Sequence, residues 1–129
     1  APAAKYLRGG WRIGLGSDVA GGHTLDLFAV MAAAVQVSKL RWRYVDQSEA
    51  PLTMTEALYL ATVGGGAFWQ DFGEQVGLFE PGYAFDALVL DDSALHNLRS
   101  FTPAERLERY AYLGKGALSA KFAQGKKLF

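Results

Sequence analysis

Asp18 is the side chain in this sequence that is best placed to do chemistry. It follows residues 12–16, a short and largely apolar run with the length of a buried parallel strand, and the glycines Gly21 and Gly22 come after it. Where a strand ends in such a loop, the strand fixes the backbone and the loop leaves the carboxylate open to substrate, as in barrels of alternating strands and helices. The same spacing also fits a turn or a helix cap.

The histidines do not complete a metal site around Asp18. The sequence has two, His23 and His96, which lie far apart. A catalytic zinc ion takes about three protein ligands and a structural one about four. His23 could approach the active site from its loop or bond to the loop backbone, and Ser17 lacks the histidine that a serine hydrolase triad needs.

Composition limits the classes of protein to consider. The 129 residues, half of them hydrophobic, suffice for one domain with a real core. Thirteen basic residues balance 13 acidic ones, which argues against binding to nucleic acid or to an anionic membrane. No cysteine is present, which suits a reducing compartment, and no apolar run reaches the roughly 18 residues of a membrane span. The N-terminus lacks the order of a signal peptide and begins Ala1-Pro2, so we expect processing or truncation.

Helices are expected on both sides of the Asp18 segment. Residues 5–8, stopped by two glycines, resemble the last turn of a helix. Residues 24–39 are apolar almost all round, which predicts a helix covered by other elements, with Thr24 as its N-cap and Asp26 in its first turn. The arginines and aromatic residues of 41–45 fit base stacking, but the neutral charge favours a surface helix end or a subunit interface.

The middle of the chain predicts another helix and a change to extended structure. Thr53 and Glu56 form a capping box, so a helix should run to about residue 62, where Gly64-Gly65-Gly66 should break it. A short helical turn should then carry Ala67, Phe68 and Trp69 into the core. Residues 76–79 and 85–90 should be strands joined by a type II turn at Pro81-Gly82, with Asp86 structural.

The C-terminal part has the clearest helix start. Thr102 should cap a helix with Pro103 at its first position and Glu105 completing the box, ending at Gly114 or Gly116. Glu105 and Arg109 lie four residues apart on it. Residues 118–129 should form a final hairpin around Gln124-Gly125.

Three segments resemble guanine deaminases of the amidohydrolase superfamily, namely residues 14–22, 54–62 and 77–91, and the similarity ends near residue 114. The resemblance covers nearly the whole chain but only the C-terminal part of the family. The family's His-x-His metal pair, its further metal histidines and its catalytic glutamate lie upstream. The implied fold class is α/β. Residues 1–75 would be the C-terminal end of a (β/α)8 (TIM) barrel, and residues 76–129 would be a composite β-sandwich segment with one helix at about 103–113.

The resemblance also implies a reaction. Zinc, held by upstream histidines and Asp18, would lower the pKa of its bound water, and Asp18 would accept the proton. Attack at C2 of guanine, with an upstream glutamate protonating the ring, would give xanthine and ammonia. Asp18 is the one residue here that the resemblance makes catalytic and metal-binding. It further implies a cytoplasmic homodimer and, as partner, the missing N-terminal part of the same protein.

Two alternatives stay open from the sequence. One is a related aminohydrolase or chlorohydrolase acting on an adenosine-type or triazine substrate, although the paired asparagines typical of that pattern are lacking here. The other is a non-catalytic fragment or binding module of the same fold. In either case we expect the chain alone to be inactive.

Overall fold

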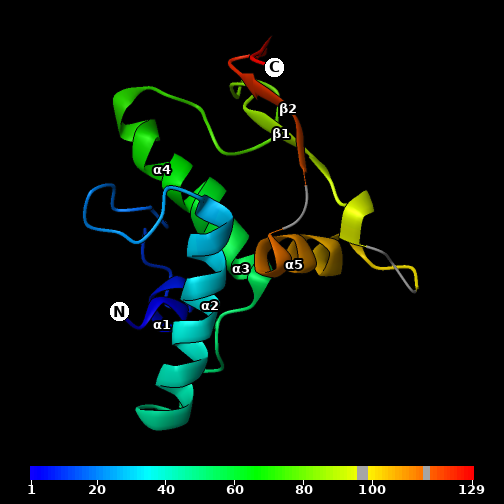
Figure 1. Ribbon diagram of the computed structural model, residues 1–129. Helices are drawn as coiled ribbons and strands as arrows, with labels where there is room; N and C mark the ends of the chain where they lie inside the picture. Colours follow the sequence, from blue (N-terminus) through cyan, green and yellow to red (C-terminus); the bar gives the residue numbers. More distant parts are fainter. Residues whose placement is uncertain (96–98, 115–116) are drawn as a thin grey trace.

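The computed structural model describes residues 1–95, 99–114 and 117–129 of the chain (Figure 1). The chain contains helices in its first part, up to Phe72, and both strands and helices in its second part, from Ala87. Its elements, in order, are α1 (Ala3–Arg8), α2 (Leu27–Tyr44), α3 (Met54–Tyr59), the π-helix η1 (Leu60–Gly64), α4 (Gly65–Trp69), the 3-10 helix η2 (Gln70–Phe72), β1 (Ala87–Asp91), the 3-10 helix η3 (Ser93–Leu95), α5 (Pro103–Leu113), β2 (Ala117–Ala123) and β3 (Lys126–Lys127).

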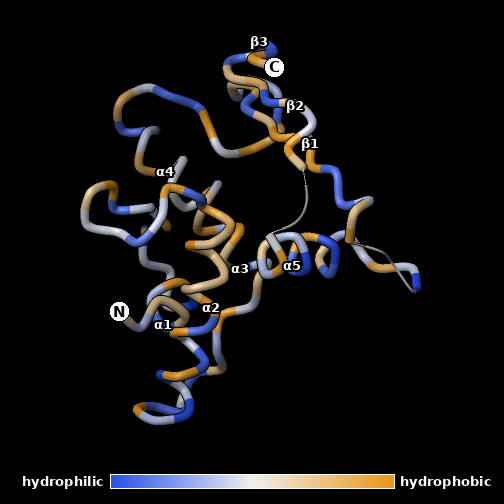
Figure 2. The backbone as a smooth tube through the Cα atoms, in the orientation of Figure 1, coloured by the Kyte–Doolittle hydropathy of each residue, from blue (hydrophilic) through white to orange (hydrophobic). Residues whose placement is uncertain are grey.

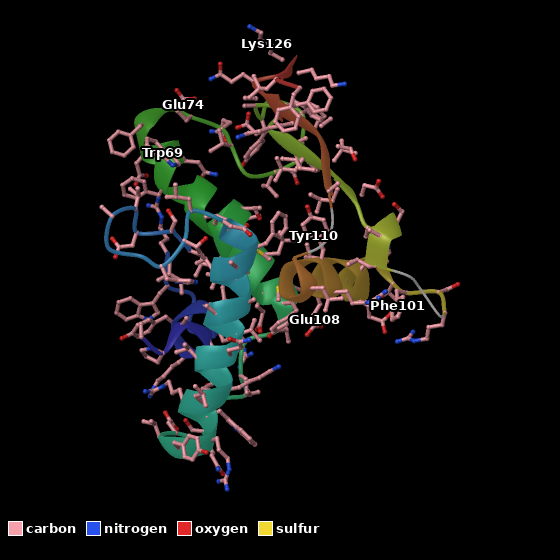
Figure 3. The ribbon with its side chains drawn as sticks, viewed as in Figure 1. Trp69, Glu74, Phe101, Glu108, Tyr110 and Lys126 are labelled. Carbon is pink, nitrogen blue, oxygen red and sulfur yellow. The ribbon has the colours of Figure 1, made fainter. Side chains whose placement is uncertain are left out.

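The hydrophobic core lies where α1, α2, α3 and α5 meet (Figure 2). Met31 and Val35 of α2 and Leu60 of η1 are its largest fully buried side chains. Phe28 of α2 meets Tyr110 of α5 edge to face, with ring centroids 4.9 Å apart (Figure 3). Burial at this contact, with the nearby charge of Asp26, raises the pKa of the Tyr110 hydroxyl. The long helix α2 is therefore the support on which α3 and α5 pack.

Both predicted capping boxes are confirmed. The Thr53 hydroxyl accepts from the Glu56 amide at 3.1 Å at the start of α3, and Thr102 does the same for Glu105 at 3.3 Å at the start of α5. Gly114, with φ +60°, ends α5. Local sequence patterns suffice for these features because every partner lies within four residues.

Helix α2 starts later and ends later than predicted. Its N-cap is Asp26, whose carboxylate accepts from the Phe28 amide at 2.9 Å, while Thr24 accepts from the Asp26 amide and so belongs to the preceding turn. The helix continues to Tyr44, so residues 41–44 form a helix end, on which Trp42 and Tyr44 are exposed. Within the described part of this chain, α2 is not covered on all sides, since Val37 and Leu40 are 57% and 58% exposed.

The glycines 64–66 do not break the helix, contrary to prediction. The chain runs from α3 through η1 and α4 into η2 without interruption. Gly66 is buried against the Val76 carbonyl oxygen, where a Cβ would not fit, so this glycine serves close packing. Phe68 and Trp69 do not enter the core. They are 59% and 53% exposed, and Trp69 projects from the outer side of α4 (Figure 3).

The two predicted strands 12–16 and 76–79 are not strands in this structure. A strand needs a neighbour for its ladder, and within the described residues none pairs with either segment. Residues 77 and 78 form a bend, in which Gly77 has φ +91°. The type II turn predicted at Pro81-Gly82 is confirmed. The Tyr83 amide donates to the Glu80 carbonyl at 3.1 Å, and Gly82 has φ +92°. The predicted strand 85–90 corresponds to β1, which spans Ala87–Asp91.

The three strands form an antiparallel sheet in the order β1-β2-β3 at one end of the molecule, beyond the helices (Figure 1). The final hairpin is thus confirmed. Asp86 is structural, as predicted, since its carboxylate accepts from the Gln124 amide at 2.7 Å. Leu88 and Val89, adjacent on β1 and on opposite faces, are 46% and 48% exposed. Both faces of the sheet therefore expose apolar side chains.

Within the described parts of the chain, no helix combines the length and the apolar character that crossing a bilayer requires.

Candidate functional site

Asp18 lies in an exposed turn directly after the extended segment 12–16. Its carbonyl oxygen accepts from the amides of Gly21, at 2.8 Å, and Gly22. Its carboxylate lies over Gly21, where an added Cβ would come within 2.7 Å of Oδ2, and a Cβ on Gly22 would meet the carbonyl of Ser17. The two glycines thus allow the backbone to close tightly around the aspartate while the carboxylate stays exposed.

The turn holds two non-glycine residues in the left-handed region. Asp18 has φ +49° and Ala20 has φ +74°. Aspartate adopts this region more readily than most residues, whereas alanine does so at a cost of about 1 kcal/mol or more. Conformations of this kind gather at functional sites, where the surrounding structure maintains them. The backbone of the turn therefore supports the choice of Asp18 as the candidate site residue.

Asp18 stands without companion ligands in the part of the chain that the structure describes. No group of three His, Asp or Glu side chains suited to a metal ion occurs among residues 1–95, 99–114 and 117–129. His23 is exposed in the same loop as Asp18, and the prediction about His96 lies outside the described residues. A single exposed carboxylate fits one ligand position of a zinc ion, so this chain can supply one ligand of a larger set.

The segment that carries Asp18 is fastened to the helices. The Leu15 amide donates to the Leu60 carbonyl of η1 at 2.9 Å. Arg12 donates to the Ala67 carbonyl and pairs with Asp71 at 3.0 Å. Sequence reasoning missed Arg12, because its acidic partner lies 59 positions away and leaves no local pattern. The nearest available signal was the glycine run 64–66, which marks a close backbone approach.

A separate apolar cleft of about 500 Å³ lies between α3, β1 and α5. The ion pair between Arg106 and Asp92, 2.6 Å apart, stands in its wall. The hydrogen bonds from Arg106 lower the pKa of the Asp92 carboxyl, and the same pair raises the pKa of Arg106. The residues that line this cleft lie between 55 and 110, so none of them belongs to the Asp18 turn.

Solved structures provide the first comparison. The chain is similar to a guanine deaminase from C. acetobutylicum, solved with guanine bound in its active site. The TM-score is 0.85 with 42% sequence identity, over 99% of this chain and 30% of that one. Likeness to the E. coli guanine deaminase, at 23% identity and a TM-score of 0.77 over 97% of this chain and 29% of that one, bears on the fold alone. The mixed helix and strand arrangement is therefore the one found in the matching 30% of the C. acetobutylicum guanine deaminase structure.

Comparison of sequences also finds guanine deaminases. The chain is 30% identical over 129 residues to the guanine deaminase of Dictyostelium discoideum, covering 96% of this chain and 28% of that protein. It thus spans under a third of the length of such relatives. The family model described as "Amidohydrolase family" matches residues 1–126. The chain belongs to the amidohydrolase family.

Proposed function

We propose that this chain supplies the Asp18-bearing part of a zinc-dependent guanine deaminase. The observation that carries the proposal is the 42% identity, over 99% of the chain, to a protein solved with guanine in its active site. In this proposal residues 1–75 are the end of a (β/α)8 barrel and residues 76–129 are part of a β-sandwich. The substrate is guanine and the products are xanthine and ammonia.

The partner of the chain is the remainder of the same fold. Two observations support this. The extended segment 12–16 lacks a neighbouring strand within the described residues, and both faces of the sheet expose apolar side chains. The remainder would add strands beside residues 12–16 and bring the metal histidines and the catalytic glutamate. We extend the proposal to a cytoplasmic homodimer for the assembled protein.

Asp18 acts as one metal ligand and as the general base. Zinc, when bound, lowers the pKa of a water molecule at the site. The Asp18 carboxylate accepts the proton, a role that needs an unobstructed oxygen and a fixed backbone. The exposed carboxylate and the tight turn closed by Gly21 and Gly22 provide these two conditions. An aspartate buried in an ion pair would have neither a free ligand position nor a ready base.

A hybrid enzyme tests the proposal. In this hybrid, the chain replaces the matching 30% of the C. acetobutylicum guanine deaminase. The rest of that enzyme is unchanged. The measurement is ammonia release from guanine, and the control is the same enzyme with the segment deleted. We expect turnover by the hybrid and none by the control. A folded hybrid without turnover would show that the chain does not perform this role.

A further inference from the structure

The π-helix η1 lies directly against the segment that carries Asp18. In a π-turn the carbonyl of residue i accepts from the amide of residue i+5, and such turns occur often at functional sites. Here the Leu60 carbonyl accepts from the Gly65 amide and, at 2.9 Å, from the Leu15 amide. One carbonyl therefore joins the helix to the extended segment.

Glycines on both sides make this approach possible. A Cβ on Gly14 would lie 2.9 Å from the Gly65 Cα, and a Cβ on Gly64 would meet the Ile13 carbonyl oxygen. These are contacts between backbones, which cannot move aside as a flexible side chain can. Gly65 differs, because a Cβ there would have only the Leu60 oxygen within 4 Å, at 3.8 Å.

We propose that η1 is a positioning element for Asp18, in which Leu60 and Gly64 fix the place of residues 13–15 and thereby of the carboxylate three residues further on. The expected effect on catalysis rests on the proposed function. The contact between η1 and residues 13–15 does not depend on that function. None of these residues touches the reacting atoms. They act by holding the Asp18 turn, and a displacement of about 1 Å at a reacting group costs on the order of 100-fold in rate.

The decisive comparison is Gly64→Ala against Gly65→Ala in the hybrid enzyme. Both glycines have helical backbone angles, with φ −61° and −66°, so both substitutions gain the same helix propensity. Only the alanine at 64 collides with the Ile13 carbonyl. The pair therefore isolates the contact from the general effect of removing a glycine.

Two readouts are measured on each variant. Hydrogen exchange of the Leu15 amide reports the contact, and we expect it to be about tenfold faster in Gly64→Ala and unchanged in Gly65→Ala. Steady-state kinetics reports the consequence, and we expect kcat for guanine to fall about 100-fold in Gly64→Ala with KM nearly unchanged. A purely structural defect would instead lower the amount of folded enzyme and leave kcat per folded molecule intact.

A second pair approaches the same contact from the other side, in case Gly64→Ala does not fold. Gly14→Ala meets the Gly65 backbone, whereas a Cβ on Gly16 has nothing within 4 Å. Equal Leu15 exchange in Gly14→Ala and Gly16→Ala, or equal kcat in Gly64→Ala and Gly65→Ala, would overturn the inference. If the parent hybrid has no turnover, the proposed function fails, and the exchange comparison alone decides whether η1 holds the segment.

Discussion

Asp18 combines an exposed carboxylate with a backbone conformation that only a few residue types adopt readily. Its φ of +49° and the two amides bonded to its carbonyl place it at the centre of a closed turn. Among the described residues no ion pair neutralises the Asp18 carboxylate, whereas that of Asp92 is paired with Arg106. The exposed Asp18 carboxylate thus differs from that of Asp92, whose ion pair with Arg106 stabilises the fold.

Replacing Asp18 by asparagine should abolish most deamination by the hybrid enzyme. The amide fills the same space but cannot accept the proton, and the loss should be about 100-fold or more. The matched control is Asp86→Asn, which makes the same chemical change at a structural aspartate whose amide oxygen can still accept from the Gln124 amide. Near-normal kcat in a folded Asp18→Asn enzyme would refute the role given to Asp18.

The position of Asp18 was predictable from its neighbours, but its anchoring was not. A short apolar run ending at an acid and two glycines is a local pattern, and it singles out Asp18 as the candidate, whose chemical role stays a prediction. The anchoring depends on Arg12 with Asp71 and on Leu15 with Leu60, pairs far apart in the sequence. Such contacts exist only once the helices have packed, so no spacing rule could reveal them.

At the scale of elements, α5 is held at its start by the capping box of Thr102 and Glu105. Thr102→Ala should lower the free energy of unfolding by about 1 kcal/mol, the usual cost of losing a threonine N-cap. The comparison is Thr55→Ala, an exposed threonine inside α3, where alanine should be neutral or slightly stabilising. Urea unfolding of the chain, at a concentration where it is monomeric, measures both. Equal midpoints for Thr102→Ala and the parent would exclude the cap.

Glu105 should make α5 sensitive to acid. A hydrogen bond from Arg99, with further ones from Thr102, lowers the pKa of Glu105 from 4.5 to about 2. Because the pKa is lower in the folded state, this contribution to stability is present above about pH 4.5 and is lost as the pH falls toward about 2. The stability difference between the parent and Glu105→Gln should therefore stay constant above about pH 4.5 and shrink as the pH falls from about 4.5 toward about 2. A difference that stays constant or grows on acidification would contradict this.

Helices were predicted better than strands for a physical reason. A helix is closed by bonds within four residues, so the starts of α3 and α5 and the stop at Gly114 follow from local sequence. A strand exists only with a neighbour, and residues 12–16 and 76–79 have none among the described residues. The prediction at glycines 64–66 was wrong because these glycines allow close contacts with distant backbone and do not end the helix.

At the scale of the whole molecule, this chain leaves apolar surface uncovered. Large hydrophobic residues are exposed on the sheet, on α4 and on α2, including Phe85, Leu88, Trp69 and Leu40. Surfaces of this kind promote association unless another part of the protein covers them. Sedimentation velocity should thus show concentration-dependent association of the isolated chain. The hybrid enzyme, in which the rest of the fold covers these surfaces, should associate less than the isolated chain. A chain that stays monomeric at about 100 μM would contradict the view that these surfaces await a partner.

Ammonia release from guanine by the separated parts is the most direct test of the central claim. The chain and the remainder of the C. acetobutylicum enzyme are produced apart and assayed with zinc, first singly and then mixed. One carboxylate cannot hold a metal ion that takes about three protein ligands, so the chain alone should neither retain zinc nor release ammonia. Mixing should restore both, and should fail when the chain carries Asp18→Asn. Release of ammonia by the chain alone, with about one zinc ion bound per chain, would contradict the account and make these 129 residues a complete enzyme.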